Sequence, residues 1–269
     1  MAAIGNKVKP KKALGQHFLT DLSIARRIAS TLDGYKGLPV MEVGPGMGVL
    51  TQFLLPEHVD VTVAEIDTES VDYLKANFPA LEGRIVEGDF LKIDLREFYG
   101  GRKCCVIGNY PYNISSQIFF HVLDYKDVVE CCSGMLQREV AERLAAAPGT
   151  KSRGILSVLL QAWYDVEYLF TVSESVFNPP PKVKSGVIRM TRNGVTDLGC
   201  DERLLKTVVK TTFGQRRKTI RNTVRALLPA GVQLPADCAL GAMRPEQLTV
   251  KEFIDLTNIV DALRGGKES

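Results

Sequence analysis

The sequence predicts an α/β fold with an open, mostly parallel sheet, followed by a small all-helical domain. Short apolar runs that end in Gly, Asp or Asn alternate with helix-like stretches as far as Met190, a pattern typical of strands joined by crossover helices. A glycine-rich turn directly follows the first of these runs. Strand-like runs then stop and helical periodicity continues to the end, so we place the boundary between domains 1–193 and 194–269.

The composition is that of a globular protein and argues against several other classes. The 269 residues are 45% hydrophobic, an ordinary value for a folded chain. No segment approaches the roughly 20 apolar residues of a membrane-spanning helix. The N-terminus also lacks the apolar core typical of a secretory signal. We therefore expect a cytoplasmic protein without membrane contact, and nothing in the sequence demands more than a monomer.

The cysteines and histidines predict no metal site. Two adjacent cysteine pairs, Cys104-Cys105 and Cys131-Cys132, lie in apolar runs, and no cysteines form the Cys-x-x-Cys pattern of zinc or redox sites. We expect them to be small core residues that stay reduced in the cytoplasm. The histidines are too scattered to propose a metal site, since they stand at His17, His58 and His121.

A basic arm and a short polar motif begin the chain. Residues 1–12 contain four lysines without apolar periodicity, so a solvated tail and a phosphate-binding arm both stay open. The motif Leu14–Leu19 is too short for a helix or strand, but it is rich in groups that could line a pocket. Thr20 or Asp21 then caps a helix with apolar residues at helical spacing.

A first strand over residues 39–43 runs into the turn Gly44-Pro45-Gly46-Met47-Gly48. Glycines in such a turn let the backbone approach a nucleotide-like ligand closely. A second strand over 59–64 ends at Glu65-Ile66-Asp67, and an acid roughly 20 residues after the turn accepts hydrogen bonds from ribose hydroxyls. A dinucleotide fingerprint would need Gly or Ala where Val49 stands. We therefore expect no pyrophosphate cradle.

Two further strand ends complete the predicted site. A strand over 84–87 leads to Gly88-Asp89-Phe90, and a strand over 104–107 leads to the turn Gly108–Ser115. The carboxyl ends of parallel strands meet at one edge of a sheet, so the glycine turn and the acids should form an adenosine pocket there. Pro111 restricts its own φ and biases Tyr110 away from the helical region, which holds the carbonyl groups of this turn in set directions.

The residues of this turn suit the exocyclic amine of an adenine, whose lone pair is delocalised into the ring. The side-chain oxygen of Asn109 and a backbone carbonyl would accept both amine hydrogens and draw the nitrogen toward a tetrahedral geometry. Tyr112 would stack on the base. The alternative is an ordinary strand-to-helix turn, because Asn-x-Pro-Tyr alone should occur by chance in roughly one chain in fifty of this size.

Later strands flank a proline-rich loop. The β-α alternation continues with strands over 128–136, 166–172 and 185–190 and helices over 116–123, 137–144 and 154–163. The loop Val176–Ser185 contains three consecutive prolines, which stiffen an extended chain. Phe177 at its start is either a satellite core residue or a second stacking face for the target base.

The C-terminal domain carries a basic stretch over residues 213–228. Arg217, Arg221 and Arg225 share one predicted helical face, opposite an apolar face that includes Ile220 and Val224. Five cations here lack acidic partners in the sequence, which favours phosphate binding over a solvated face. The whole chain carries only +3, from 34 basic and 31 acidic residues, so a nucleic-acid partner must be met by such local clusters.

Six ordered motifs together resemble the KsgA/RsmA family of ribosomal RNA adenine dimethyltransferases. The resemblance covers nearly the whole chain, including Gln215–Lys218, and its motifs are Leu14–Leu19, Glu42–Gly48, Glu65–Asp67, Gly88-Asp89, Asn109–Ser115 and Phe177–Val183. It implies a Rossmann-like class I methyltransferase sheet that uses S-adenosylmethionine. It further implies dimethylation of two adjacent adenosines in the 3′-terminal hairpin loop of 16S ribosomal RNA, coupled to small-subunit biogenesis.

The resemblance also implies roles for individual residues. Asn109 and Pro111 match the reacting centre, with Tyr112 and Phe177 as the stacking pair. Cofactor contacts are expected from His17, Leu19, Gly44, Gly46, Glu65, Ile66, Asp89, Phe90 and Asn109. RNA contacts are expected from Lys182, Arg216, Arg217, Lys218 and Arg221. We expect direct in-line methyl transfer, with neither a metal nor a covalent enzyme intermediate.

Two departures from the family and two alternatives accompany this hypothesis. The family commonly has Leu where this chain has Tyr110 and often Asn where it has His17; position 110 should contribute mainly backbone, so we expect activity to survive.

One alternative is a large-subunit ribosomal RNA adenine dimethyltransferase, against which the loop at Phe177 and the Gln215–Lys218 segment argue. The other is a ribosome-assembly binding factor whose catalysis is secondary. A DNA adenine methyltransferase is less favoured, since no separate sequence-reading domain is visible.

Overall fold

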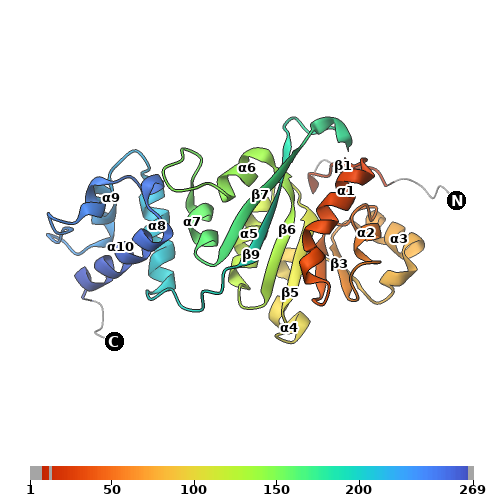
Figure 1. The fold of residues 1–269 in the computed structure, drawn as a ribbon, viewed down its shortest axis with the longest axis horizontal. Helices are drawn as coiled ribbons and strands as arrows, with labels where there is room; N and C mark the ends of the chain where they lie inside the picture. Colours follow the sequence, from red (N-terminus) through yellow and green to blue (C-terminus); the bar gives the residue numbers. More distant parts are fainter. Residues whose placement is uncertain (1–7, 12–13, 266–269) are drawn as a thin grey trace. The chain divides into compact units, whose positions relative to one another are not determined.

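The computed structural model describes residues 8–11 and 14–265, which divide into two compact units (Figure 1). Unit 1 contains the described residues up to Glu142 together with Asp165–Arg192. Unit 2 contains Arg143–Tyr164 and the described residues from Asn193 onward. Residues 143–164 thus group with the C-terminal helices, whereas the sequence placed them in the first domain. The reason is that helix α7 (Ile155–Gln161) packs on helices α8 (Glu202–Gly214) and α10 (Val250–Leu263).

Unit 1 is built on the predicted sheet, which has seven strands in the order β4-β3-β2-β5-β6-β9-β7. The strands from β4 to β6 pair in parallel, and β9 joins β6 antiparallel. The chain leaves β2 toward β3 on one side and returns to β5 on the other, which creates a topological switch point between β2 and β5. The strands are β2 (Val40–Val43), β3 (Val61–Glu65), β4 (Ile85–Glu87), β5 (Cys104–Asn109), β6 (Val129–Gln137), β7 (Tyr164–Val172) and β9 (Ser185–Arg192).

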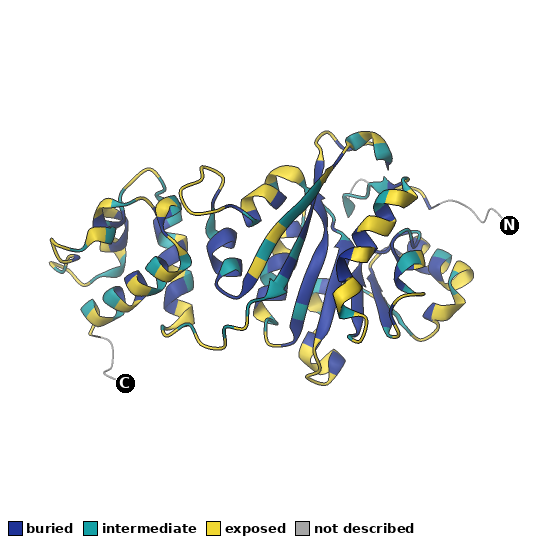
Figure 2. Ribbon diagram, in the orientation of Figure 1, coloured by how far each residue is buried: buried dark blue, intermediate teal, exposed yellow. Residues whose placement is uncertain are grey.

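Helices cover the sheet, and most residues of the central strands are buried whereas the helices carry many exposed residues (Figure 2). The first helix starts where predicted, because the side chain of Asp21 accepts hydrogen bonds from the backbone N–H groups of Ser23 (2.9 Å) and Ile24 (3.3 Å). The helices of unit 1 are α1 (Leu22–Ala29), α2 (Thr51–Leu54), α3 (Thr68–Asn77), α4 (Leu95–Tyr99), α5 (Ser115–Asp124) and the first part of α6 (Arg138–Leu144).

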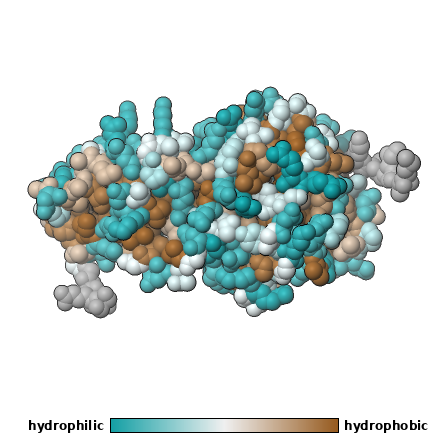
Figure 3. All heavy atoms as spheres, viewed as in Figure 1, coloured by the Kyte–Doolittle hydropathy of each residue, from teal (hydrophilic) through white to brown (hydrophobic). Residues whose placement is uncertain are grey.

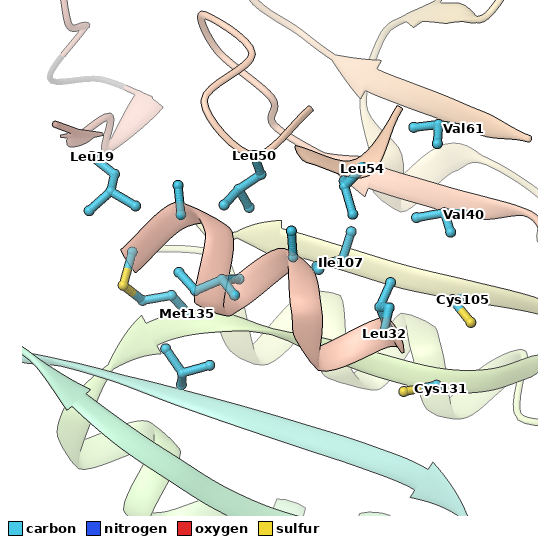
Figure 4. Packing of buried hydrophobic residues seen from close by; sticks show 14 of the residues in the cluster. Leu19, Leu32, Val40, Leu50, Leu54, Val61, Cys105, Ile107, Cys131 and Met135 are labelled. Atoms are coloured by element: carbon cyan, nitrogen blue, oxygen red, sulfur yellow. The ribbon is translucent and has the colours of Figure 1, made fainter. Parts of the chain in front are cut away.

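One hydrophobic cluster joins the first helix to the sheet. Figure 4 shows side chains from several strands, among them Ile107 and Met135, gathered with Leu50 and Leu54 around this helix. The two adjacent cysteine pairs are buried and form no disulfide, as predicted from their apolar surroundings. Burial of this cluster fixes α1 on the sheet, and so also fixes the position of the Leu14–Leu19 motif that precedes this helix.

The polar motif before α1 forms a short strand, which the sequence did not predict. Strand β1 (Phe18–Leu19) pairs antiparallel with β8 (Phe177–Asn178), so that Leu19 lies opposite Phe177. The backbone N–H of Thr20 extends this pairing with a hydrogen bond of 2.8 Å to the Val176 carbonyl. The pairing brings the N-terminal motif and the proline-rich loop together at the sheet edge.

Unit 2 is helical around a core that includes Val208, Val209 and Leu256. Its last helix begins with a capping box, since Thr249 and Glu252 each bond the other's backbone N–H. The basic stretch is less helical than predicted: residues 215–218 form a turn, and α9 covers only Ile220–Val224. Arg217 and Arg221 therefore do not share one helix.

The surface visible in Figure 3 is mostly hydrophilic, with apolar residues in small groups between polar ones. That mixture is normal for a globular protein. Within residues 8–11 and 14–265, no helix combines the length and the apolar character that crossing a membrane requires.

Candidate active site

A cavity of about 280 Å³ lies at the carboxyl ends of β2, β3, β4 and β5. Its position next to the switch point is where open α/β sheets bind ligands. Every residue predicted to contact a cofactor lines it, and these residues are His17, Leu19, Gly44, Gly46, Glu65, Ile66, Asp89, Phe90 and Asn109. Segments far apart in sequence therefore meet at one site.

The glycine turn after β2 adopts a backbone conformation that favours glycine. Gly44, Gly46 and Gly48 have φ values of +64°, +56° and +74°, which lie in the left-handed region. A Cβ atom on Gly46 would meet the ring of Phe18 at 2.9 Å, and one on Gly48 would meet the ring of Phe78 at 2.4 Å. The turn thus brings its backbone close to the cavity and packs against two aromatic rings.

Glu65 ends β3, and backbone N–H groups fix its carboxylate. One oxygen accepts hydrogen bonds from the N–H groups of Ile66 and Asp67, both at 2.9 Å, and the other accepts one from Gly46 at 3.0 Å. Burial raises the pKa of this carboxyl, and the three N–H groups oppose that shift. Since an ionised carboxylate can accept about four hydrogen bonds, one acceptor position remains for a ligand hydroxyl.

Glu42 is a further acid in the cavity wall, and its sequence position alone predicts no separate role for it. It lies on β2, is 1% exposed, and accepts a hydrogen bond of 2.6 Å from the Thr51 hydroxyl. Burial raises the pKa of Glu42 to about 8. The sequence does contain a sign that Glu42 is unusual, because it is a single carboxylate inside an apolar strand and burying a charge is costly.

The wall after β3 and β4 combines an apolar face with an acid. Ile66 is 58% exposed although it lines the cavity, so its side chain is open to a flat ligand ring. Asp89 accepts a hydrogen bond of 3.0 Å from the backbone N–H of Leu91, and Phe90 beside it is buried. Among residues 8–11 and 14–265, no group of three or more His, Cys, Asp or Glu side chains could hold a metal ion.

Asn109 ends β5 with its amide in a defined orientation. Its Nδ2 donates a hydrogen bond of 3.1 Å to the backbone carbonyl of His17. In the part of the chain that the structure describes, Oδ1 of this amide accepts no hydrogen bond. The amide therefore presents a free acceptor at the cavity.

Tyr110 anchors the same turn to β6 through its side chain as well as its backbone. Its N–H donates to the Met135 carbonyl (2.8 Å), and its buried hydroxyl donates to the Ser133 carbonyl (2.7 Å). Cβ atoms on Gly108 or Gly134 would collide with the Tyr110 ring, so these glycines make room for it. The Tyr110 side chain thus has a structural role in holding the turn, and its contribution at the cavity stays a prediction.

Tyr112 and His17 form an aromatic edge of the cavity. Their ring centroids are 5.5 Å apart with an angle of 30° between the ring planes. The Tyr112 hydroxyl lies 2.5 Å from the Ser185 hydroxyl, and burial raises the pKa of the phenol. His17 Nδ1 lies within hydrogen-bond distance of the Pro179 carbonyl at 2.8 Å. His17 thus connects the turn after β5 to the proline-rich loop.

The described part of the basic arm is attached to the protein. Lys11 forms an ion pair with Asp67 and another with Glu69 at 3.1 Å. Its backbone N–H donates to the side chain of Gln16 at 2.8 Å, and Gln16 also bonds Asp67. Lys11 is therefore not free for phosphate. Lys9 is described and exposed, and the other two lysines of the arm, at positions 7 and 12, lie outside the described residues.

Phe177 does not line the cavity, contrary to the stacking role expected for it. Its side chain is 4% exposed and belongs to the main hydrophobic cluster. The reason is the β1–β8 pairing, which places Phe177 opposite Leu19. In this structure the residue is part of the core that supports the N-terminal motif.

The predicted RNA contacts have different environments. Arg221 is half-buried, and three of its five N–H groups are directed at backbone carbonyls, those of Leu234 (2.7 Å), Ala236 (3.2 Å) and Cys238 (3.4 Å). Arg216 is partly occupied by the Lys151 carbonyl at 2.5 Å and by Glu246 at 3.6 Å. The exposed cations are Lys182 in unit 1 and Arg217 and Lys218 in unit 2.

Comparisons with known proteins identify the family. The family model "Ribosomal RNA adenine dimethylase" matches residues 7–262. A protein from Parabacteroides distasonis named "Ribosomal RNA small subunit methyltransferase A" is 69% identical over 94% of this chain and 94% of its own length. A protein of the same name from Flavobacterium johnsoniae is 55% identical over 95% of this chain and 97% of its own length.

Solved structures share the fold. A dimethyladenosine transferase from Plasmodium falciparum superposes with a TM-score of 0.73 at 22% identity, over 93% of this chain and 98% of the other. The 23S rRNA methyltransferase ErmE superposes with a TM-score of 0.65 at 26% identity, over 88% of this chain and 99% of the other. The predicted class I methyltransferase sheet with a helical C-terminal part is thereby confirmed.

Proposed function

This chain belongs to the ribosomal RNA adenine dimethylase family, and we propose that it transfers methyl groups from S-adenosylmethionine to adenosines of small-subunit ribosomal RNA. The choice of subunit is supported by the name shared by the curated relatives, which this chain matches over more than nine-tenths of its length. We further propose that the targets are two adjacent adenosines in the 3′-terminal hairpin loop of 16S ribosomal RNA. The enzyme would act as a cytoplasmic monomer during small-subunit biogenesis.

The orientation of the Asn109 amide carries this proposal. Because Nδ2 is occupied by the His17 carbonyl at 3.1 Å, Oδ1 is the atom offered to a ligand, and an acceptor is what an adenine amine requires. Together with a backbone carbonyl of the Tyr110-Pro111 turn, it would hold both amine hydrogens. Such acceptors stabilise the amine more as its nitrogen becomes tetrahedral and cationic than in its planar ground state.

The residues around the cavity fit S-adenosylmethionine. Glu65 retains one acceptor position for a ribose hydroxyl, Ile66 offers an exposed apolar face for an adenine ring, and Asp89 lies next to that face. When bound, S-adenosylmethionine supplies an activated methyl group on a sulfonium. The protein's own task is then to align the amine with that methyl group and to exclude water.

Tyr112 is the stacking residue in this proposal. The target base must leave its stack, which costs least in an RNA loop, and the Tyr112 ring lines the cavity next to Asn109. Phe177 could stack on the same base only by leaving the hydrophobic cluster. We therefore assign Phe177 to the support of β1.

Two alternatives are distinguished by one experiment. Similarity to the 23S rRNA methyltransferase ErmE motivates a large-subunit test, and the assembly-factor hypothesis motivates a binding test. Labelled S-adenosylmethionine is incubated with small subunits purified from cells that lack the modification, with large subunits and DNA in parallel, and labelled nucleosides are identified by mass spectrometry. Dimethyladenosine in the small subunit alone is the expected result. Label in large subunits or DNA would refute the substrate, and binding without label would favour the assembly role.

A further inference from the structure

We propose that Ser185 is a positioning residue that holds the ring of Tyr112 at the cavity. The inference rests on the proposed function, since it concerns the same methyl transfer. Ser185 is the first residue of β9 and is 0% exposed, and its hydroxyl lies 2.5 Å from that of Tyr112. The two residues are separated by 73 positions in the sequence, so the contact joins the reacting turn to a distant strand.

The contact restricts the side-chain rotation of Tyr112, which the turn itself does not fix. The backbone at this residue lies inside a turn closed by a hydrogen bond of 3.2 Å from the Ile114 N–H to the Pro111 carbonyl. A tyrosine on a fixed backbone still rotates about χ1 and χ2. Its hydroxyl is the atom farthest from the backbone, so a hydrogen bond there limits the χ1 swing of the ring most strongly.

Ser185 is suited to this task because strand pairing fixes its backbone, so its hydroxyl cannot move along with the Tyr112 ring. Its backbone lies opposite Gln137 in the β6–β9 pairing, and the carbonyl of the preceding Lys184 accepts a hydrogen bond of 2.9 Å from the Arg138 N–H. The His17 ring also lies beside Tyr112, with 5.5 Å between the two ring centroids. The ring is therefore held at its hydroxyl end by a rigid strand and flanked by a second ring.

Holding the ring in place should raise turnover rather than cofactor affinity. An incoming base meets a stacking face that is already oriented, so less conformational freedom is lost when the amine aligns with the methyl group. Without the Ser185 hydroxyl, the ring would spend part of its time in other rotamers. Ser185 has no contact with the acids that we assign to the cofactor, so cofactor binding should not change.

The same strand offers a matched control. The Tyr35 hydroxyl donates a hydrogen bond of 3.1 Å to the hydroxyl of Thr191, also on β9. Neither of these residues lines the cavity. The variant Thr191→Val removes a tyrosine–hydroxyl contact from β9 without touching the reacting turn, and it therefore reports the purely structural cost of such a loss.

The test compares Ser185→Ala, Tyr112→Phe, the double variant and Thr191→Val. We measure kcat and KM with small ribosomal subunits, the Kd of S-adenosylmethionine and the melting temperature. Ser185→Ala and Tyr112→Phe should each lower kcat by about tenfold, and the double variant should lower it no further. The Kd should match wild type in all four, and the melting temperature of Ser185→Ala should match that of Thr191→Val.

Several results would overturn the inference. The positioning role would be refuted if Ser185→Ala kept the wild-type kcat. It would also be refuted if Thr191→Val lost as much kcat as Ser185→Ala, or if the losses of kcat in the two single variants multiplied in the double variant. If Ser185→Ala does not fold, Tyr112→Phe breaks the same contact from the other side, and wild-type kcat in that variant is equally decisive. Failure of the wild-type protein to methylate small subunits would instead refute the proposed function.

Discussion

Asn109 presents its Oδ1 to the reacting amine in the proposed mechanism, so its removal should affect turnover far more than cofactor binding. Asn109→Ala deletes the free acceptor and leaves the buried anchor Tyr110 in place. Removal of a single preorganised polar group at a reacting centre typically costs about 10²–10³ in kcat, and we expect a loss of that size. Kinetics with small subunits and calorimetric titration with S-adenosylmethionine measure the two quantities separately.

A matched asparagine provides the control for this variant. Asn77 also donates its amide to a backbone carbonyl, that of Tyr73 at 2.8 Å, but it lies at the end of α3 and does not line the cavity. Asn77→Ala should keep wild-type turnover. If Asn109→Ala also turned over at a rate near wild type, the assignment of Asn109 to the reacting centre would be wrong.

Glu42 should make the stability of the protein depend on pH. Burial raises the pKa of this carboxyl from 4.5 to about 8, so between these values the unfolded chain loses a proton that the folded chain keeps. The free energy of unfolding therefore falls as pH rises through this window. The free energy of unfolding of Glu42→Gln, relative to that of wild type, should therefore rise by up to about 3 kcal/mol between pH 5 and pH 8.

Urea unfolding at several pH values measures this difference. The exposed carboxylate Glu82 gives the comparison, because Glu82→Gln removes an acid that is not buried in the sheet. If the free energies of unfolding of Glu42→Gln and wild type differed by the same amount at every pH, Glu42 would ionise normally in the folded protein. In that case Glu42 would be a charged acid in the cavity wall.

At the level of elements, the β1–β8 pairing determines where the N-terminal motif lies. Phe177 is buried in the main cluster opposite Leu19, so Phe177→Ala should lower the free energy of unfolding by about 3 kcal/mol, as is usual for a truncated core aromatic. Val183→Ala, on the same loop but exposed, should have little effect. Urea unfolding of both variants tests this, and similar stabilities would contradict the core assignment.

The elements that the sequence predicted well are those that carry local signals. The strands before Gly44, Glu65 and Asp89 were predicted because apolar runs ended at turn residues or acids, and parallel pairing then brought those ends to one cavity. The pairing of β1 with β8 was missed, because each strand has two residues and their partners are distant in sequence. Pairing of that kind leaves no periodic pattern.

The side-chain environments that the sequence did not predict are those that depend on tertiary partners. Arg221 has the spacing of a phosphate-binding face, yet it binds three backbone carbonyls of the 234–238 segment. Nothing in a sequence distinguishes an arginine that holds a loop from one that awaits a ligand. For the same reason, residues 143–164 were placed with the sheet although α7 packs on the helices of unit 2.

For the whole molecule, a net charge of only +3 means that RNA affinity should depend on local groups of exposed cations. Arg217 and Lys218 are exposed in unit 2, whereas the guanidinium of Arg221 is bonded to carbonyls. Arg217→Glu should therefore weaken binding to small subunits and reduce the slope of log K against log salt by about one. Lys251→Glu, which reverses a lysine paired with Asp255 at 3.4 Å, changes the net charge equally and should leave that slope nearly unchanged. Equal slopes for both variants would mean that the effect follows net charge and that Arg217 makes no phosphate contact.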